Sequence, residues 1–386
     1  MGGTVRDFLS DRSSQDIDLV AALTAEQLEN LAFCRVRPKS GVPIFFRCHD
    51  SLGKIEVTTI DAPTDLEADL HRRDVTANAM ALSLTGVFFD PLDGYAALRA
   101  RELRPCGPSA LVSDPLRIFR LFRFEAAGWR MTPHAEDLIR EREWGDQLSR
   151  VPVERFSGEL LKALAEDDPA WFFRRMIEFG VGREFLPELF LMREIPAGPV
   201  AYHPEGDLFT HSLQALERVC LMTGDVVIRF CALFHDLGKL ETAPELYPKH
   251  HGHDEAGFRL SRPFCDRLAL PAALRSSLGW VNRLHTTAGR WEELRSSTKI
   301  KLAETAVRGG VADILPLVVA ADKPGGAGMP GWENAVRIAR LPTAALGIDP
   351  RLLADFPVDG VVPLQPRQRP ALVRQKRVEL FRSQVI

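Results

Sequence analysis

The sequence lacks the features of a secreted or membrane-spanning protein. In its 386 residues no apolar run approaches the roughly 20 residues needed to span a bilayer. The opening residues, MGGTVRD, contain no apolar stretch, which argues against a secretory signal. The 49 basic and 52 acidic residues nearly cancel, so the chain is no polycation and would bind nucleic acid only through a local patch. These absences predict a cytoplasmic protein without a membrane partner.

Paired cysteines are absent, and lysine is absent from a long stretch. The six cysteines are irregularly spaced and none lies in a CxxC pair, which argues against a cysteine zinc cluster and favours reduced thiols. No lysine occurs between Lys54 and Lys162. The basic side chains of that stretch are arginines, whose planar guanidinium suits two-pronged recognition of phosphates and bases.

The pattern of apolar residues changes along the chain. Strand-like segments lie at 16–20, 54–60 and 86–90, and a helix that Thr24 would cap is predicted over 24–33. Beyond about residue 110 the pattern is helical almost throughout. The length suggests two or three folded units. The sequence therefore predicts an α+β protein with a small mixed-sheet head, a helical middle and a second helical unit rich in histidine.

Asp16 and Asp18 are two residues apart in the first strand-like segment. The two-residue period of a strand puts both carboxylates on one face, roughly 6–7 Å apart. Oxygen ligands at this spacing suit two hard cations, as two-metal phosphoryl transfer requires. Glu56, on the next predicted strand, could supply a third carboxylate. A solvated acidic strand edge has the same pattern, so the flanking residues decide between the two interpretations.

Glycines and arginines flank this carboxylate pair. Gly2 and Gly3 let backbone N–H groups approach a triphosphate, and Arg6 and Arg72 offer guanidinium forks for its oxygens. Asp74 could accept a hydrogen bond from a ribose hydroxyl. For Arg72 and Asp74 the alternative is an ordinary surface ion pair.

Six motifs in series resemble the class II tRNA nucleotidyltransferase and poly(A) polymerase family. They are GGTVRD (2–7), DID (16–18), RRDVTANAMA (72–81), DPLDG (90–94), SDPLRIFRLFRF (113–124) and ERFSGE (154–159). The resemblance implies a polymerase-β-like nucleotidyltransferase head over 1–112 and a helical neck and body over 113–198 that selects the base and binds tRNA. It also implies Mg²⁺ held by Asp16 and Asp18 as the catalytic residues. The implied nucleotide-binding residues are Gly3, Arg6, Arg72, Asp74, Asp114, Arg117 and Arg120.

In that family an acidic residue and an arginine one turn apart read the incoming base, and the matching residues here are Asp114 and Arg117. Cytosine and adenine each present an amino donor beside an acceptor nitrogen, which complement an Asp acceptor and an Arg donor. Guanine and uracil would point a carbonyl at the carboxylate. The resemblance thus implies that CTP and ATP are chosen without a nucleic-acid template. Taken alone, the same pair is also typical of an ion pair in the first turn of a helix.

The chain departs from the family pattern at several points. Only Met1 precedes the paired glycines, Ser113 stands where Glu is usual, and Ala97 stands where Asp is usual. The stretch between Glu56 and Arg72 is short, whereas CCA-adding members usually carry a longer flexible loop there that helps the site change from C to A. The short stretch resembles the CC-adding subgroup. We hypothesise that C addition is retained and that terminal A addition is weak or absent.

Histidines gather in the second half of the chain. His235 and Asp236 follow the apolar segment 230–234, and a His-Asp pair buried there would be costly unless it bound something. Imidazoles with carboxylates suit transition metals or magnesium. A lone buried histidine is usually a core residue whose hydrogen bonds are all made. Several further histidines follow in this half of the chain, and they favour a metal site.

Three motifs in this half, HPEGDLFTHSL (203–213), RFCALFHDLGK (229–239) and KHHGHDEAG (249–257), resemble the HD domain fused to some bacterial CCA-adding enzymes. The resemblance implies an HD phosphohydrolase domain with a helical tail over 199–386. It would act as a phosphatase and 2′,3′-cyclic phosphodiesterase on RNA ends, with Mg²⁺, Mn²⁺, Ni²⁺ or a similar divalent metal. The implied metal ligands are His211, His235, Asp236, His253, His285 and Asp322, and the implied phosphate-binding residues are Lys239 and His250.

The sequence thus predicts a tRNA 3′-end nucleotidyltransferase with a second, HD-type hydrolase activity. Its expected partners are the 3′ acceptor end and upper stem of tRNA, with CTP and ATP, and it could be a monomer or a homodimer. Three alternatives stay open. They are a poly(A) polymerase, an alarmone-type synthetase and hydrolase (whose usual domain order is the reverse), and an HD phosphohydrolase with an inactive head.

Overall fold

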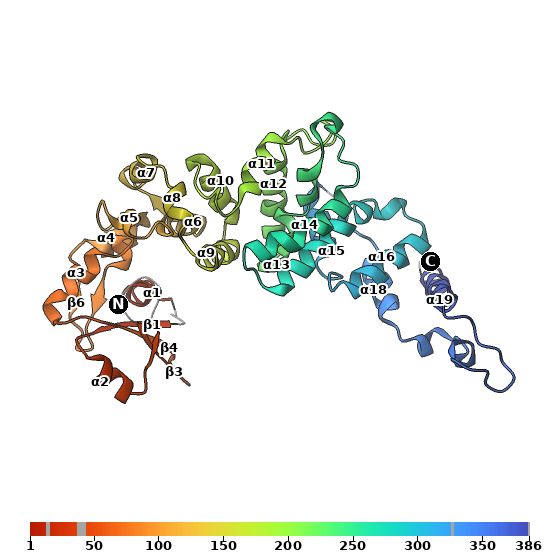
Figure 1. The fold of residues 1–386 in the computed structure, drawn as a ribbon, viewed down its shortest axis with the longest axis horizontal. Coiled ribbons are helices and arrows are strands. Elements are labelled where there is room, and N and C mark those ends of the chain that lie inside the picture. The colour runs from red at the N-terminus through yellow and green to blue at the C-terminus, as the bar shows by residue number, and fades with distance from the viewer. Residues whose placement is uncertain (13–15, 37–43, 326–327, 385–386) are drawn as a thin grey trace. The chain divides into compact units, whose positions relative to one another are not determined.

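The computed structural model describes residues 1–12, 16–36, 44–325 and 328–384, and for Asp16 it describes the backbone alone. The chain divides into two compact units, Met1–Glu159 with Arg174–Val181 and Leu160–Phe173 with Gly182–Ile386. The first unit contains the strands and the second is helical (Figure 1). The predicted α+β class is therefore confirmed.

The first unit is built on a four-stranded sheet. Its strands are β1 (Asp16–Ala21), β2 (Cys34–Val36), β3 (Ile44–His49) and β4 (Gly53–Thr59), in the spatial order β1-β4-β3-β2. β1 and β4 run parallel, and the other neighbouring pairs are antiparallel. The sequence predicts β1 and β4 from their alternating, β-branched residues but misses β2 and β3. β2 is short and exposed along its whole length, so it has no buried face to impose an apolar alternation.

One face of this sheet is apolar and the other carries acids. Leu19 of β1 and Val57 of β4 are register partners; Val57 is buried with Phe45 in a core cluster, and the partly buried Leu19 packs against that cluster. Asp18 and Glu56 are register partners one residue earlier. Because successive side chains of a strand point to opposite faces, these two carboxylates lie on the face away from that core.

Helix α2 (Ala25–Asn30) closes the apolar face of the sheet. Thr24 forms a capping box with Gln27, in which the Thr24 hydroxyl accepts from the Gln27 N–H at 3.2 Å and the Gln27 side chain accepts from the Thr24 N–H at 2.8 Å. Leu28, in the middle of α2, is buried in the same core cluster as Phe45. The predicted cap is confirmed. The helix is shorter than predicted because Ala32, just beyond its end, has a φ of 62°, in the left-handed region.

The rest of the head and the segment that follows it consist of helices and two-residue strands. α1 (Gly3–Phe8), which the sequence does not predict, lies against β1 (Figure 1). The further elements as far as α10 are α3 (Leu66–His71), β5 (Ala81–Leu82), β6 (Phe88–Phe89), α4 (Gly94–Ala100), β7 (Glu102–Leu103), α5 (Ala110–Ser113), α6 (Arg117–Ala126), β8 (Arg130–Met131), α7 (Pro133–Arg140), α8 (Gly145–Leu148), α9 (Val153–Ala165) and α10 (Pro169–Phe179).

A buried ion cluster joins α6, α7 and α10. Arg175 donates from Nε and Nη2 to the two oxygens of Glu125, at 2.7 and 2.8 Å. It also donates to Glu136 at 2.6 Å and to Glu178 at 2.8 Å. The side chains of Arg175 and Glu125 are only 10% and 3% exposed, so neither charge could be solvated if the other were removed.

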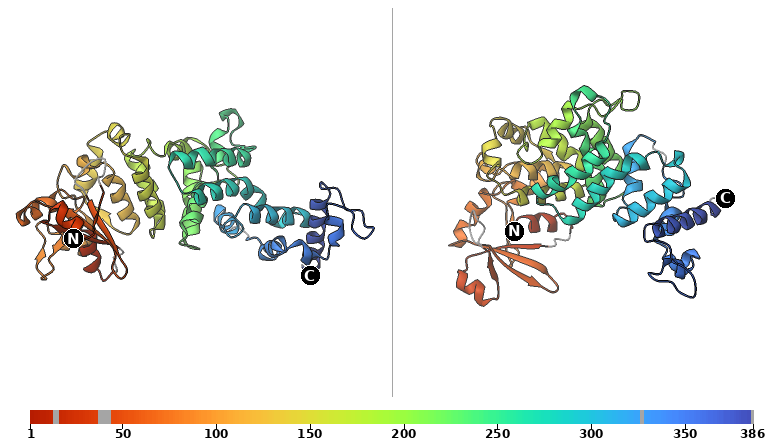
Figure 2. Two further views of the ribbon diagram at one scale, coloured as in Figure 1. Left: turned by 60° about the horizontal axis from the view of Figure 1, so that its bottom comes forward. Right: turned by 45° about the vertical axis from the view of Figure 1, so that its right-hand side comes forward.

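The second unit is a packed set of helices. Its main elements are α11 (Pro187–Leu191), α12 (Leu208–Cys220), α13 (Val226–Leu233), the 3-10 helix η4 (Leu237–Glu241), α14 (His253–Arg267), α15 (Ala272–Ala288), α16 (Ser296–Arg308), α17 (Leu315–Asp322), α18 (Trp332–Arg340) and α19 (Arg369–Ser383). α12, α13, α15 and α17 pack on one another, and α14 lies along α15 (Figure 2). Phe230 and Phe234 pack against Phe264 of α14, and Val281 of α15 is fully buried.

Among the described residues, every helix is too short or too polar to cross a lipid bilayer.

All six cysteines are free thiols.

We predict that Arg175→Leu lowers the free energy of unfolding by about 3 kcal/mol, because it leaves Glu125 as a buried, unpaired charge. Arg140→Leu is the matched control. Arg140 pairs with Glu136 and Glu178 of the same cluster but is 47% exposed, so its loss should cost less than about 1 kcal/mol. Urea unfolding of the full chain measures both, and equal losses would contradict the role given to the buried pair.

Candidate functional site

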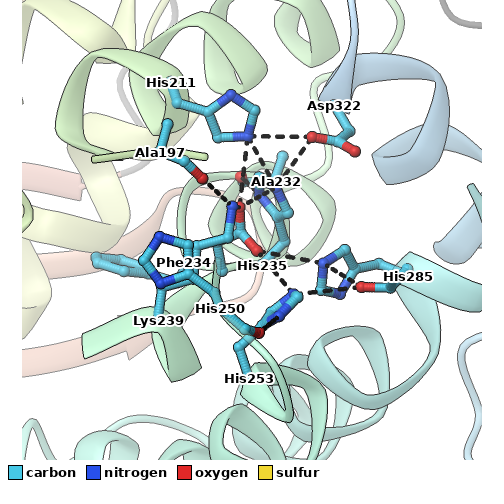
Figure 3. Close-up of polar contacts among 12 residues, drawn as sticks. Ala197, His211, Ala232, Phe234, His235, Lys239, His250, His253, His285 and Asp322 are labelled. Carbon is cyan, nitrogen blue, oxygen red and sulfur yellow. Dashed lines mark hydrogen bonds and ion pairs between the residues drawn. The ribbon is translucent and has the colours of Figure 1, made fainter. Parts of the chain in front are cut away.

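Four side chains of the second unit direct their polar atoms at one point. His211 lies in the first turn of α12, His235 follows α13, Asp236 precedes η4, and Asp322 ends α17. His211 Nε2 and His235 Nε2 are 3.1 and 3.3 Å from Asp322 Oδ1, and 3.5 and 3.3 Å from Asp236 Oδ2. The two Nε2 atoms are 3.3 Å apart (Figure 3). We call these four residues the first donor group.

The other oxygen of Asp236 belongs to a second donor group. Asp236 Oδ1 is 3.4 Å from His253 Nε2, at the start of α14, and 3.3 Å from His285 Nε2, on α15 (Figure 3). This oxygen is buried and has no hydrogen-bond partner. Asp236 therefore offers one carboxylate oxygen to each group.

The geometry of both groups fits a bound cation. When ligands surround one ion at metal–ligand distances near 2.1 Å, neighbouring ligand atoms lie about 3.0–3.4 Å apart. The donor atoms here are 3.1 to 3.5 Å apart, which is at or beyond the upper end of hydrogen-bond distances and close to the range for ligands of one ion. Two Nε2 atoms that face each other at 3.3 Å repel unless a proton or a metal lies between them. Imidazole and carboxylate together suit divalent transition metals and Mg²⁺.

The electrostatics of the site also favour a cation. Burial alone would lower the pKa of His235, but Asp236 and Asp322 outweigh burial and raise this pKa to about 10. Burial would raise the pKa of Asp236, yet Lys239 and His235 hold it well below its usual range. Burial would raise the pKa of Asp322 as well, but its hydrogen bonds with His211 and His235 hold it well below its usual range. Both acids are thus charged at neutral pH, and the field that attracts a proton to His235 would also attract a metal ion.

Lys239 and His250, the two predicted phosphate-binding residues, lie beside the cluster. Lys239 Nζ is 2.6 Å from Asp236 Oδ2 and donates to the Ala197 carbonyl at 2.6 Å (Figure 3). His250 is engaged at both ring nitrogens, by the Thr242 hydroxyl at 3.0 Å and the Pro196 carbonyl at 2.8 Å. Binding of phosphate by His250 would therefore require one of these hydrogen bonds to break.

In the first unit, the paired glycines lie against the start of β1. The N–H of Asp18 donates to the Thr4 hydroxyl at 2.8 Å, and the Met1 amino group donates to the Asp18 carbonyl. A Cβ added at Gly3 would lie 3.8 Å from Asp18 Oδ2, so the glycine loop and this carboxylate are neighbours. Glu56 lies beside Asp18 in the sheet and forms an ion pair with Lys54. The side chain of Asp16 lies outside what the structure describes.

A chain of polar contacts connects the glycine loop to α6. Arg6 donates to Asn78 Oδ1 at 2.7 Å, Asn78 donates to Asp74 Oδ1 at 3.1 Å, and Arg120 is 3.1 Å from Asp74 Oδ2. Burial would raise the pKa of Asp74, but Arg120 and the hydrogen bonds from Val75 and Asn78 hold it below its usual range. Asn78 was not among the predicted site residues. It lies inside the RRDVTANAMA motif, and that position was the only signal for it in the sequence.

The two predicted base-reading residues have separate partners in this structure. Asp114 accepts from Arg155 at 2.7 Å, whereas Arg117 donates to the backbone carbonyls of Ala110 at 2.8 Å and Arg72 at 2.9 Å. The Arg72 side chain pairs with the buried Asp69. Arg117 thus ties the RRD motif to the helix that follows the head. The roles in catalysis and binding assigned to these residues stay predictions.

A carboxylate-bearing mixed sheet followed by a helical His-Asp cluster is the arrangement of a nucleotidyltransferase joined to an HD domain. Family models match the chain in three places: the poly(A) polymerase head domain at 44–104, the probable RNA- and SrmB-binding site of polymerase A at 133–192, and the HD domain at 208–310. A multifunctional CCA protein of Alkalilimnicola ehrlichii is 37% identical over 79% of this chain and 77% of that protein. One of Methylococcus capsulatus is 35% identical over 93% of this chain and 90% of that protein. The chain therefore belongs to the multifunctional CCA protein family.

The fold agrees with solved structures of CCA-adding enzymes. An apo form of a CCA-adding enzyme matches with a TM-score of 0.66 and 21% identity, over 100% of this chain and 86% of that one. The Thermotoga maritima CCA-adding enzyme in complex with tRNA matches with a TM-score of 0.64 and 19% identity, over 100% of this chain and 87% of that one. The predicted family and enzyme class are confirmed.

We predict that Asp236→Asn weakens metal binding by more than about 10-fold, because the cluster loses a charge that faces both donor groups. Isothermal titration calorimetry of the metal-free full chain with Mn²⁺ measures the affinity. The control is Asp313→Asn, whose carboxylate is exposed and pairs with Arg340, and which should bind Mn²⁺ as the unmodified protein does. Equal affinity for all three proteins would contradict the site.

Proposed function

We propose that the protein adds cytidine to the 3′ end of tRNA from CTP without a nucleic-acid template, with little or no addition of the terminal A from ATP. The observation that carries the proposal is the position of Asp18, next to the glycine loop and beside Glu56 on the acidic face of the sheet. The multifunctional CCA proteins that the chain resembles, and the CCA-adding enzymes solved with ATP and with CTP, support the choice of substrates.

In this mechanism the residues of the head hold the nucleotide and its metal. Mg²⁺ held by Asp16 and Asp18 would activate the tRNA 3′-hydroxyl and stabilise the leaving pyrophosphate. Gly3 lets the backbone approach the triphosphate, and the guanidinium groups of Arg6 and Arg72 neutralise its charge.

Base selection falls to the start of α6. Asp114 would accept from the amino group of cytosine or adenine while Arg117 donates to the neighbouring ring nitrogen. Both residues have other partners in this structure, so selection requires Asp114 to leave Arg155 and Arg117 to leave the Ala110 and Arg72 carbonyls. Arg120 would contribute indirectly, because its ion pair holds the Asp74 side chain in place.

The connection between β4 and the RRD motif supports the restriction to cytidine. β4 ends at Thr59, and a 3-10 helix (Pro63–Asp65) and α3 fill almost all of the segment before Arg72. That leaves no length for the flexible loop which, by resemblance to the family, helps the site change from C to A.

We further propose that the second unit hydrolyses phosphate esters at RNA ends, including 2′,3′-cyclic phosphates. It would use two divalent ions, one in each of the two donor groups that share Asp236. Mg²⁺, Mn²⁺ and Ni²⁺ all suit the donor set. Bound there, they would supply an activated water and neutralise the phosphate. Lys239, 2.6 Å from Asp236, keeps that carboxylate ionised and adds positive charge near the phosphate.

The division of labour follows the predicted boundaries. We propose that 1–112 is the catalytic head, that 113–198 selects the base and contacts the tRNA acceptor end and upper stem, and that 199–386 is the hydrolase with its tail. The three family models each fall within one of these segments, which supports the division. The free cysteines are compatible with a reducing cytoplasm, where we propose that the protein acts.

Truncated tRNA lacking its 3′ end tests the nucleotide product. With CTP and ATP together we expect the gel to show extension by cytidine that stops before the terminal adenosine. Efficient completion to CCA would contradict the restriction to cytidine, and long tails from ATP alone would indicate a poly(A) polymerase.

Paired variants test whether the two sites are separate. We expect Asp18→Asn to lower cytidine transfer by about 100-fold or more and to leave phosphatase activity unchanged. Asp236→Asn should have the opposite effects. If either variant lost both activities while folding normally by circular dichroism, the two-site account would be wrong.

A further inference from the structure

The four histidines of the metal cluster share one orientation. Each directs Nε2 into the cluster and engages Nδ1 outside it. For three of them the partner of Nδ1 is the backbone carbonyl three residues earlier: Ala232 for His235 at 2.8 Å, His250 for His253 at 2.6 Å, and Asn282 for His285 at 2.9 Å. With Nδ1 as the donor in each of these hydrogen bonds, the neutral ring has its lone pair on Nε2, which can coordinate a cation.

His211 is the exception. Its Nδ1 contacts the carboxylate oxygen Oε1 of Glu205 at 2.7 Å. The side chains of His211 and Glu205 are 2% and 9% exposed, so the contact is shielded from water. His203 Nδ1 contacts the same oxygen at 3.0 Å. Of the four histidines, His211 is the one whose shortest Nδ1 contact is to a charged side chain; His285 Nδ1 also lies 3.8 Å from Asp254, but its shortest contact is to a carbonyl.

The loop that carries Glu205 is fixed at its base. The Ala197 N–H donates to the Gly206 carbonyl at 2.8 Å, and the Leu208 N–H donates to the Ile195 carbonyl at 2.8 Å. The His203 ring packs against Gly198, where an added Cβ would lie 2.3 Å from His203 Cδ2. Glu205 is therefore held in place independently of any bound ion.

A carboxylate at Nδ1 differs chemically from a carbonyl. It fixes the same tautomer, but its negative charge also makes the ring a stronger donor at Nε2.

Glu205 could instead be a metal ligand itself, together with His203 and His211, because the three donor atoms are close together. That arrangement would need His211 to bind one ion through Nδ1 and another through Nε2, with no proton on the ring. A neutral imidazole whose Nδ1–H donates to the carboxylate needs no such ionisation, so the hydrogen bond is the better account.

We propose that Glu205 is a positioning residue that orients His211 and strengthens its donor nitrogen, and so tightens binding of a divalent ion in the first donor group. The inference rests on the metal site put forward above. Glu205 lies in the HPEGDLFTHSL motif but was not among the predicted site residues, because it lies in a turn before α12, where no helical or strand period relates it to His211.

Cobalt binding tests the proposal, because the visible absorption of Co²⁺ reports its coordination. The metal-free full chain is titrated with Co²⁺, as are Glu205→Ala, Glu205→Gln and the control Glu241→Gln. Glu241 is an exposed carboxylate of η4 that pairs with Arg259. We expect Glu205→Ala to weaken binding of one Co²⁺ by about 10–100-fold. Glu205→Gln should be intermediate, because its amide oxygen still accepts the Nδ1–H but carries no charge. Glu241→Gln should bind as the unmodified protein does.

A spectroscopic signal separates positioning from a general structural role. In the Co²⁺-loaded protein, each coordinated histidine gives a shifted, exchangeable Nδ1–H proton resonance. Glu205→Ala should lose one of these resonances and keep the others, with an unchanged melting temperature of the metal-free protein.

The outcomes distinguish the failure of each idea. If the unmodified protein binds no Co²⁺, the metal site itself is wrong. If it binds Co²⁺ and Glu205→Ala binds equally well with all resonances present, the positioning role is wrong. Loss of a full equivalent of Co²⁺ in Glu205→Gln, with no weakening elsewhere, would show instead that Glu205 is a ligand.

Discussion

The structure of the second unit depends on one buried carboxylate. Asp236 is 2% exposed, and its two oxygens face separate groups of donors from α12, α14, α15 and α17. Burying two acids and four histidines together is costly without a positive charge among them, and Lys239 is the one permanent cation in direct contact with Asp236 among the described residues. A metal-dependent hydrolase needs this arrangement, because the same unbalanced field that would destabilise a simple core attracts divalent ions.

The first unit also gathers acidic side chains at its site, but it places them on a sheet rather than among packed helices. Its acids lie on a strand, beside a glycine loop, and arginines from the RRD motif and α6 are held near them by Asp69, Asp74 and backbone carbonyls. The sheet holds Asp18 and Glu56 half-buried on its face away from the core, whereas the helical cluster encloses its donors. Under the proposed function both units act on phosphates, because the first would extend an RNA end and the second would hydrolyse phosphate esters at such an end.

Part of this organisation could be predicted from the sequence. β1 and β4 are visible because their apolar residues alternate and pack on one core, and the cap of α2 is visible in Thr24 and Gln27. The histidines and aspartates of the second unit could be named from their motifs. Their division into two groups could not, because it depends on how helices far apart in the sequence pack and on which Asp236 oxygen faces which ring. Asn78 and Glu205 were missed for the same reason, since hydrogen bonding to other site residues leaves no periodic signal.

The most direct measurement is anomalous X-ray diffraction from crystals of the full chain soaked in Mn²⁺. The account predicts two peaks in the second unit, one bounded by His211, His235 and Asp322 and the other by His253 and His285, with Asp236 between them. A single peak away from Asp236, or no peak in this unit, would contradict it.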